Sequence, residues 1–114
     1  MEQLISLDGI KMRVVKTAEG GEVNADTLFE FSQDGPLVSA RYAGGKVRLG
    51  YLVGWLSQQS LRFRYSQVDH EGRLDGGSST CEIGRTDIGK LRLIEHFEWA
   101  SREGSGTNIF EEIE

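Results

Sequence analysis

The sequence has few of the residues that form disulfides, membrane spans or long helices. It holds a single cysteine, Cys81, among its 114 residues, so it cannot form an internal disulfide and fits a reducing compartment. No apolar run reaches the ~18 residues that a membrane helix needs. The segment 1–8 carries acids instead of the basic and apolar regions of a signal peptide. We therefore expect a cytoplasmic protein without membrane contact.

Excess positive charge and metal-ligand spacing are also missing. The chain has 13 basic and 18 acidic residues, a formal net charge of -5. This balance disfavours nucleic acid as a partner, because phosphate affinity depends on clustered Lys and Arg. We interpret the alternation of Arg62 and Arg64 as a solvated strand face. Neither His70 nor His96 has Cys or His at metal spacing, so we expect no metal and no cofactor.

Glycine is abundant, and it divides the chain into short segments of strand-like sequence. Fifteen glycines accompany one proline, a ratio that fits many tight turns. Within the segments, apolar and polar residues alternate with the period of two that is typical of half-buried strands. The predicted strands are 10–18, 26–33, 37–43, 46–56, 61–69, 73–84, 90–101 and 106–113.

These segments predict an all-β fold, a single domain over residues 1–114 that forms an antiparallel eight-stranded up-and-down (meander) barrel of the calycin-like type. An even number of strands lets the first and last pair antiparallel, which removes both sheet edges. A two-sheet sandwich is the alternative, but it usually needs longer crossover connections.

Five polar or aromatic residues share the phase of the apolar positions, so they would point into the barrel. Such a lining suits a small polar ligand, provided that the interior leaves a void above about 300 Å³. In the alternative interpretation Glu95 pairs with an interior partner such as Gln67 or an arginine, and the rings close the barrel ends. The predicted ligand-binding residues are Tyr42, Tyr65, Gln67, Glu95 and Trp99.

The segment 46–56 is apolar on both faces. Gly50 and Gly54 lie on one face, where they indicate a bend or a close approach of another chain segment. We expect Leu52, Leu56 and Ile94 to form an exposed apolar patch, which could make the protein a homodimer instead of a monomer.

No catalytic residue is predicted. Cys81 has no nearby base, so we expect a small buried apolar residue and not a nucleophile. The glycine-rich stretches 75–79 and 104–107 precede no helix, so they are interpreted as turns or a bulge and not as phosphate cradles. Glu111 we assign to the acidic C-terminal tail.

Four short sequence patterns, taken in order, resemble those of a family of small bacterial proteins. They are Phe29-x-Phe31-x-Gln33-x-Gly35, Val38-x-Ala40-x-Tyr42-x-Gly44-Gly45, Tyr65-x-Gln67 and Gly89-Lys90-x-Arg92-Leu93-x-Glu95. Its members are often labelled N-acetylglutamate synthase. The resemblance covers nearly the whole chain and implies the fold, with no catalytic residue carried over. Acetyltransferases of the usual fold hold the cofactor pyrophosphate at a helix N-terminus, and this chain offers no such strand-loop-helix, so we expect no acetyltransferase activity.

Three functions stay open. The leading hypothesis is a barrel that binds a small molecule inside, similar in architecture to the lipocalin, fatty-acid-binding and avidin-like barrels. The second is a protein-interaction or scaffolding module with a packed interior. The third is a lyase or isomerase with Glu95 as base and Tyr65 as electrophile.

Overall fold

The computed structural model describes residues 5–19 and 21–113, which form eight antiparallel strands. Their bounds fall within a few residues of those predicted, because glycine turns end most of them. The strands are β1 (Lys11–Lys16), β2 (Leu28–Asp34), β3 (Leu37–Gly44), β4 (Val47–Ser57), β5 (Ser60–Asp69), β6 (Leu74–Arg85), β7 (Leu91–Trp99) and β8 (Ser105–Ile113).

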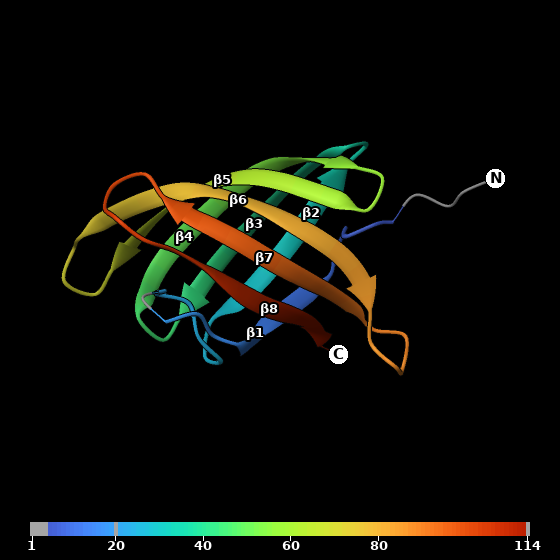
Figure 1. Ribbon diagram of the computed structural model, residues 1–114, viewed down its shortest axis with the longest axis horizontal. Helices are drawn as coiled ribbons and strands as arrows, with labels where there is room; N and C mark the ends of the chain where they lie inside the picture. Colours follow the sequence, from blue (N-terminus) through green and yellow to red (C-terminus); the bar gives the residue numbers. More distant parts are fainter. Residues whose placement is uncertain (1–4, 20, 114) are drawn as a thin grey trace.

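The strands form one closed barrel in sequence order, as predicted (Figure 1). β1 pairs antiparallel with β8 through Met12 opposite Glu112 and Val14 opposite Phe110. This pairing gives the first and last strands hydrogen-bonding partners and leaves the sheet without an open edge. No helix among the described residues is long and apolar enough to cross a membrane.

Alternate residues of each strand fill the interior, and the phases of β2, β3, β5 and β7 match the prediction. A fully buried Phe110 of β8 packs on Phe29 of β2, with ring centroids 4.6 Å apart. Phe29 in turn stacks on Tyr42 of β3 at 4.5 Å. These rings make the middle of the barrel a packed apolar core.

The segment that precedes β1 packs beside the end of β2. Leu7 is fully buried, and its backbone N–H donates to Gln33 Oε1 at 2.8 Å. The backbone N–H of Gly9 donates to the carbonyl of Phe31 at 3.0 Å. This segment therefore occupies the barrel end that lies opposite the connections β1–β2, β3–β4, β5–β6 and β7–β8 (Figure 1).

The predicted exposed patch on β4 is wrong. Leu52 and Leu56 are buried, whereas Tyr51, Val53 and Trp55 are more than half exposed. A register shift between Val47 and Leu49 changes the phase of the strand. Val47, with an odd number, faces the interior before the shift, whereas the even-numbered Leu52 and Leu56 face it afterwards. Ile94 on β7 is only partly exposed and lies apart from the exposed side chains of β4.

Two glycines of β4 leave room for aromatic rings of the neighbouring strands, as their pattern predicted. Gly50 pairs with Tyr42, and a Cβ at Gly50 would overlap the Tyr42 ring. Gly54 pairs with Phe63, and a Cβ there would overlap Phe63 and the carbonyl of Arg62. β4 thus contributes space to the interior where its neighbours contribute rings.

Replacing Gly50 with alanine is expected to destabilise the barrel by about 1–3 kcal/mol, because the added methyl group displaces the Tyr42 ring from a packed core. Gly84→Ala is the matched control, since a Cβ at Gly84 on β6 meets no atom within 4 Å. Urea unfolding of both variants measures the difference. Equal stabilities would contradict the packing described for Gly50.

Candidate binding site

A small pocket lies inside the barrel, toward the end that holds the connection between β1 and β2. Side chains from six strands and from the β1–β2 connection surround it. Its lining consists of Gly21, Glu22, Val23, Phe29, Tyr42, Leu52, Phe63, Tyr65, Gln67, Glu95, Phe97, Trp99 and Asn108.

All five residues predicted from the strand phases line this pocket. Tyr42, Gln67, Glu95 and Trp99 are buried, and Tyr65 is partly exposed. They come from β3, β5 and β7, so the closed barrel brings together side chains that are far apart in sequence.

Glu95 is the most buried acid of the lining, and two side chains hold its carboxylate. Ser79 Oγ donates to Glu95 Oε2 at 2.6 Å, and Asn108 Nδ2 donates to Glu95 Oε1 at 2.9 Å. Asn108 Oδ1 in turn accepts from the backbone N–H of Ala18 at 2.7 Å. The carboxylate is thereby fixed between β6 and β8 and tied to the segment that follows β1.

Glu95 pairs with interior side chains, as the alternative interpretation expected, but the partners it named, Gln67 or an arginine, are wrong. Gln67 accepts a hydrogen bond from Tyr42 instead, with 2.9 Å between Tyr42 Oη and Gln67 Oε1. In the strand register Asn108 of β8 lies directly opposite Glu95. On the other side of Glu95, its paired residue on β6 is Cys81, and Ser79 lies two residues before Cys81. Asn108 shares the phase of buried Phe110, a signal that could have identified it.

Gln67 has an unused donor. Its side chain is 4% exposed, and its carbonyl oxygen accepts from Tyr42. Among residues 5–19 and 21–113, no group accepts a hydrogen bond from its amide nitrogen. The nitrogen is not sealed off, because no fully buried polar side-chain atom of the described residues lacks a partner. An amide nitrogen without a protein partner at the wall of a pocket normally faces water or a ligand.

The low polarity of the pocket shifts the titration of its acidic groups. Burial raises the pKa of Glu95 above its ordinary value of 4.5, and the hydrogen bonds from Asn108 and Ser79 oppose this rise. Burial and the nearby Glu95 carboxylate both raise the pKa of Tyr42 and of Tyr65, so both phenols stay protonated at neutral pH. The pocket therefore offers phenol donors beside one carboxyl group.

The pocket is much smaller than the void above about 300 Å³ that a preformed ligand site would have. The part of it that the centre of a water molecule can reach is about 20 Å³, whereas all the space between the lining side chains, the solvent at its mouth included, is about 330 Å³. The smaller volume suits about one water molecule. The prediction of a preformed void is therefore wrong, because aromatic rings fill most of the barrel.

Three rings cover the mouth of the pocket. Trp99 meets Tyr65 edge to face with 5.6 Å between ring centroids, and it meets Phe97 in the same way at 5.7 Å. The guanidinium carbon of Arg102 lies 4.2 Å from the centroid of the Trp99 ring, a cation–π contact. We call Tyr65, Phe97 and Trp99 the aromatic cover.

Buried charges hold the loops around the aromatic cover. The carboxylates of Glu22 and Asp75 are more than nine-tenths buried, and each meets both Arg73 and Arg102. The shortest contact joins Arg73 Nη2 and Glu22 Oε1 at 3.1 Å. Arg73 also contacts Asp69, at 3.5 Å from Nε to Oδ2. We call these five residues the charge clasp. It connects the β1–β2, β5–β6 and β7–β8 loops, and it was not predicted from the sequence.

The chain resembles a known protein family over nearly its whole length. A family model described as avidin-like protein matches residues 5–113. The chain belongs to the avidin-like family. No curated protein and no solved structure matches it. The match agrees with the predicted barrel architecture, and it gives no support to the label N-acetylglutamate synthase.

The other residues considered in the sequence analysis have structural roles in this avidin-like barrel. Cys81 is fully buried, and burial raises the pKa of its thiol, so it packs as a small apolar residue. The assignment of Glu111 to the acidic tail is wrong, because it lies within β8, where it forms an ion pair with Arg92 at 3.2 Å from Oε2 to Nη2. No group of three or more His, Cys, Asp or Glu side chains in the described part of the chain could hold a metal ion.

The interpretation of 75–79 as a turn or bulge is wrong, because the stretch lies within β6. Within β6, position 77 requires glycine, because a Cβ there would overlap the carbonyl of Glu98 and come 2.6 Å from the Tyr65 hydroxyl. Residues 105–107 likewise lie in β8, and only Gly104 is left to the turn before it.

The raised pKa of Glu95 predicts a pH-dependent stability. Folded Glu95 binds its proton more tightly than unfolded Glu95, so its contribution is fully present below about pH 4.5 and is lost as pH rises toward the folded pKa. The free energy of unfolding of the wild type, minus that of Glu95→Gln, should therefore fall above pH 4.5, by at most about 1.4 kcal/mol per pH unit. Urea unfolding between pH 4 and pH 8 measures it. A difference independent of pH would show that the pKa is not raised.

Proposed function

We propose that this avidin-like protein binds a small neutral molecule that carries an amide-like group in the pocket beside Gln67 and Glu95. The observation that supports it is the Gln67 side chain, which lines the pocket and whose amide nitrogen donates to no described residue. Family membership supports small-molecule binding in general.

The polar groups define the chemistry of the ligand. The Gln67 N–H₂ group requires an acceptor, such as a carbonyl oxygen. The Glu95 carboxylate, already held by Ser79 and Asn108, has further lone pairs that accept from an N–H or O–H donor. An amide carries both functions within one short group. Aromatic rings supply most of the remaining wall, so the rest of the molecule is apolar.

A neutral ligand suits the site better than a charged one. The carboxylate of Glu95 repels an anion, and no Lys or Arg lines the pocket within the described residues. Placing a cation beside Glu95 would require it to lose its water in an apolar cavity, a costly step unless the pairing is excellent.

Binding requires the aromatic cover to move, because the closed pocket suits about one water molecule. Tyr65 is the member best placed to move. It is partly exposed, and the only hydrogen bond of its hydroxyl to the described residues is a long one of 3.5 Å to the carbonyl of Glu98. Trp99 is restrained by Arg102, which the charge clasp holds. Release of Arg102 therefore frees Trp99 to move along with Tyr65.

Glu95 is better suited to hold a ligand than to act as a catalytic base. Both of its oxygens accept short hydrogen bonds from the protein, which fix its position and oppose its protonation. The electrophile proposed with it, Tyr65, faces the carbonyl of Glu98. The arrangement favours the binding hypothesis over the lyase or isomerase hypothesis.

The test of binding uses a library of neutral primary and secondary amides with apolar substituents, screened by thermal shift and titrated by calorimetry. Tyr42→Phe/Gln67→Leu removes the amide and its partner together, so no buried hydroxyl loses its acceptor. We expect this variant to bind at least about tenfold more weakly than the wild type, the loss of one good hydrogen bond.

Tyr42→Phe alone is the matched control, because it keeps the Gln67 amide; its affinity should stay within about threefold of the wild type. Failure of every amide to bind the wild type would refute the proposal. Equal binding by the double variant would place the ligand elsewhere.

Loss of Arg102 should loosen the aromatic cover. In a Trp55→Phe background Trp99 is the only tryptophan of the chain. Arg102→Ala should raise the acrylamide quenching constant of its fluorescence at least about twofold, since local opening becomes easier. Arg48→Ala is the control, an exposed arginine of β4 outside the charge clasp. Identical quenching in both variants would show that Arg102 does not hold the cover.

A further inference from the structure

An apolar surface lies on the outside of the barrel, away from the pocket. Tyr51, Val53 and Trp55 of β4 are 56–60% exposed, and Leu37 of β3 is 44% exposed. Leu37 pairs directly with Trp55, so the four side chains adjoin. We call them the β4 face. Exposed apolar residues that adjoin one another in this way are candidates for a site of association, whereas isolated ones are ordinary on a protein surface.

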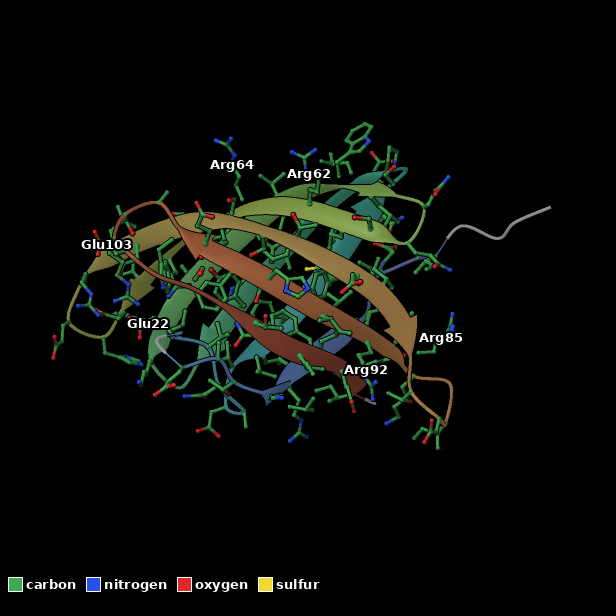
Figure 2. The ribbon with its side chains drawn as sticks, in the orientation of Figure 1. Glu22, Arg62, Arg64, Arg85, Arg92 and Glu103 are labelled. Atoms are coloured by element: carbon green, nitrogen blue, oxygen red, sulfur yellow. The ribbon has the colours of Figure 1, made fainter. Side chains whose placement is uncertain are left out.

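Opposite charges flank the β4 face. On one side β2 presents the exposed acid Asp34, and on the other side β5 presents Arg62 and Arg64. The other exposed acid of β2, Glu30, already pairs with Arg41 of β3 at 3.8 Å. Figure 2 shows Arg62 and Arg64 pointing away from the barrel. Neither arginine forms an ion pair with another described residue.

The strand register places these residues in rows that cross four strands. The row that matters most runs Asp34, Leu37, Trp55, Arg62, from acid through apolar to base. The next row, two residues along each strand, runs Ser32, Ser39, Val53, Arg64. A surface with an acid at one end of a row and a base at the other can pair with a copy of itself.

We propose that the β4 face joins two copies of this chain around a two-fold axis that runs along β4. Such an axis exchanges the two sides of the face, so β5 of each copy lies over β3 of the other, next to β2. Arg62 of each copy then meets Asp34 of the other, and this contact occurs twice because a two-fold interface is isologous. The tryptophan, tyrosine and valine of the two copies pack between these pairs.

The charges exclude the other face-to-face arrangement. A two-fold axis perpendicular to the strands would place β5 over β5 and bring Arg64 of one copy onto Arg64 of its partner. Like charges brought together in an interface cost several kcal/mol, about the size of a weak binding energy. The charge pattern therefore selects the axis along β4.

The face is small, so the dimer is weak. From β2 to β5 it spans three strand spacings, about 15 Å, and two rows cover about 15 Å along the strands with their side chains. These dimensions give about 225 Å² from each copy, less than the ~800 Å² per partner of a standard specific interface, so only weak association is expected, with a dissociation constant of about 10–500 µM. An anionic polymer is a poorer occupant, because the net charge of the chain is -5.

Sedimentation velocity over a protein concentration from about 5 µM to about 1 mM tests the proposal. The wild type should change from monomer to dimer in this range. Trp55→Ser should weaken association at least about tenfold, and Ile88→Ser, which removes an exposed apolar residue elsewhere, should not. Wild type that stays monomeric at 1 mM would overturn the proposal.

The charge pairs give a sharper test. Asp34→Arg and Arg62→Asp should each weaken self-association, because each places like charges at both ends of the face. A mixture of the two variants should form a heterodimer, since every Arg then meets an Asp, and the double variant Asp34→Arg/Arg62→Asp should dimerise as the wild type does. Dimerisation of each single variant at wild-type strength, or a mixture that stays monomeric, would overturn the arrangement.

The dimer does not depend on the proposed ligand. The β4 face points outward and the pocket inward, so loss of amide binding leaves the association test unchanged, and a monomeric protein leaves the binding test unchanged.

Discussion

The pairing of β1 with β8 is the constraint on which the other features depend. It turns a row of hairpins into a cylinder, and only a cylinder places Glu95 of β7, Asn108 of β8 and Gln67 of β5 around one space. In an open sheet these side chains would share one face, and the carboxylate would keep its water. Closure removes that water and makes hydrogen bonding by Ser79 and Asn108 necessary.

The interior combines a tightly packed middle with a polar end. Phe29, Tyr42 and Phe110 stack in the middle, where Gly50 of β4 makes room for one of the rings. At the end with the β1–β2 loop, polar groups gather under the aromatic cover, and the charge clasp holds the loops above them. The middle supplies stability, while the polar end holds the groups that could recognise a ligand. A barrel of eight strands has little room for more, since its side chains nearly fill it.

The fold and the inward-facing residues could be predicted because both depend on local patterns. Glycine turns mark the strand ends, and alternation assigns Tyr42, Gln67 and Glu95 to one face of their strands. The exposed face of β4 could not be predicted, since one register shift near Val47 reverses the phase of everything after it. Nor could the charge clasp, because Glu22, Arg73 and Arg102 lie in loops without periodicity and reach Asp69 of β5 and Asp75 of β6 only when the barrel closes. The size of the pocket depends on how the rings pack, which alternation does not encode.

The central claim is that the polar end of the interior holds a small molecule. Native mass spectrometry of the protein, purified without denaturation from the cells that produce it, tests this most directly. We expect the chain to carry one noncovalent small-molecule adduct, which is lost on denaturation and is absent from Tyr42→Phe/Gln67→Leu. A bare chain in every preparation, or an adduct that the double variant retains, would contradict it.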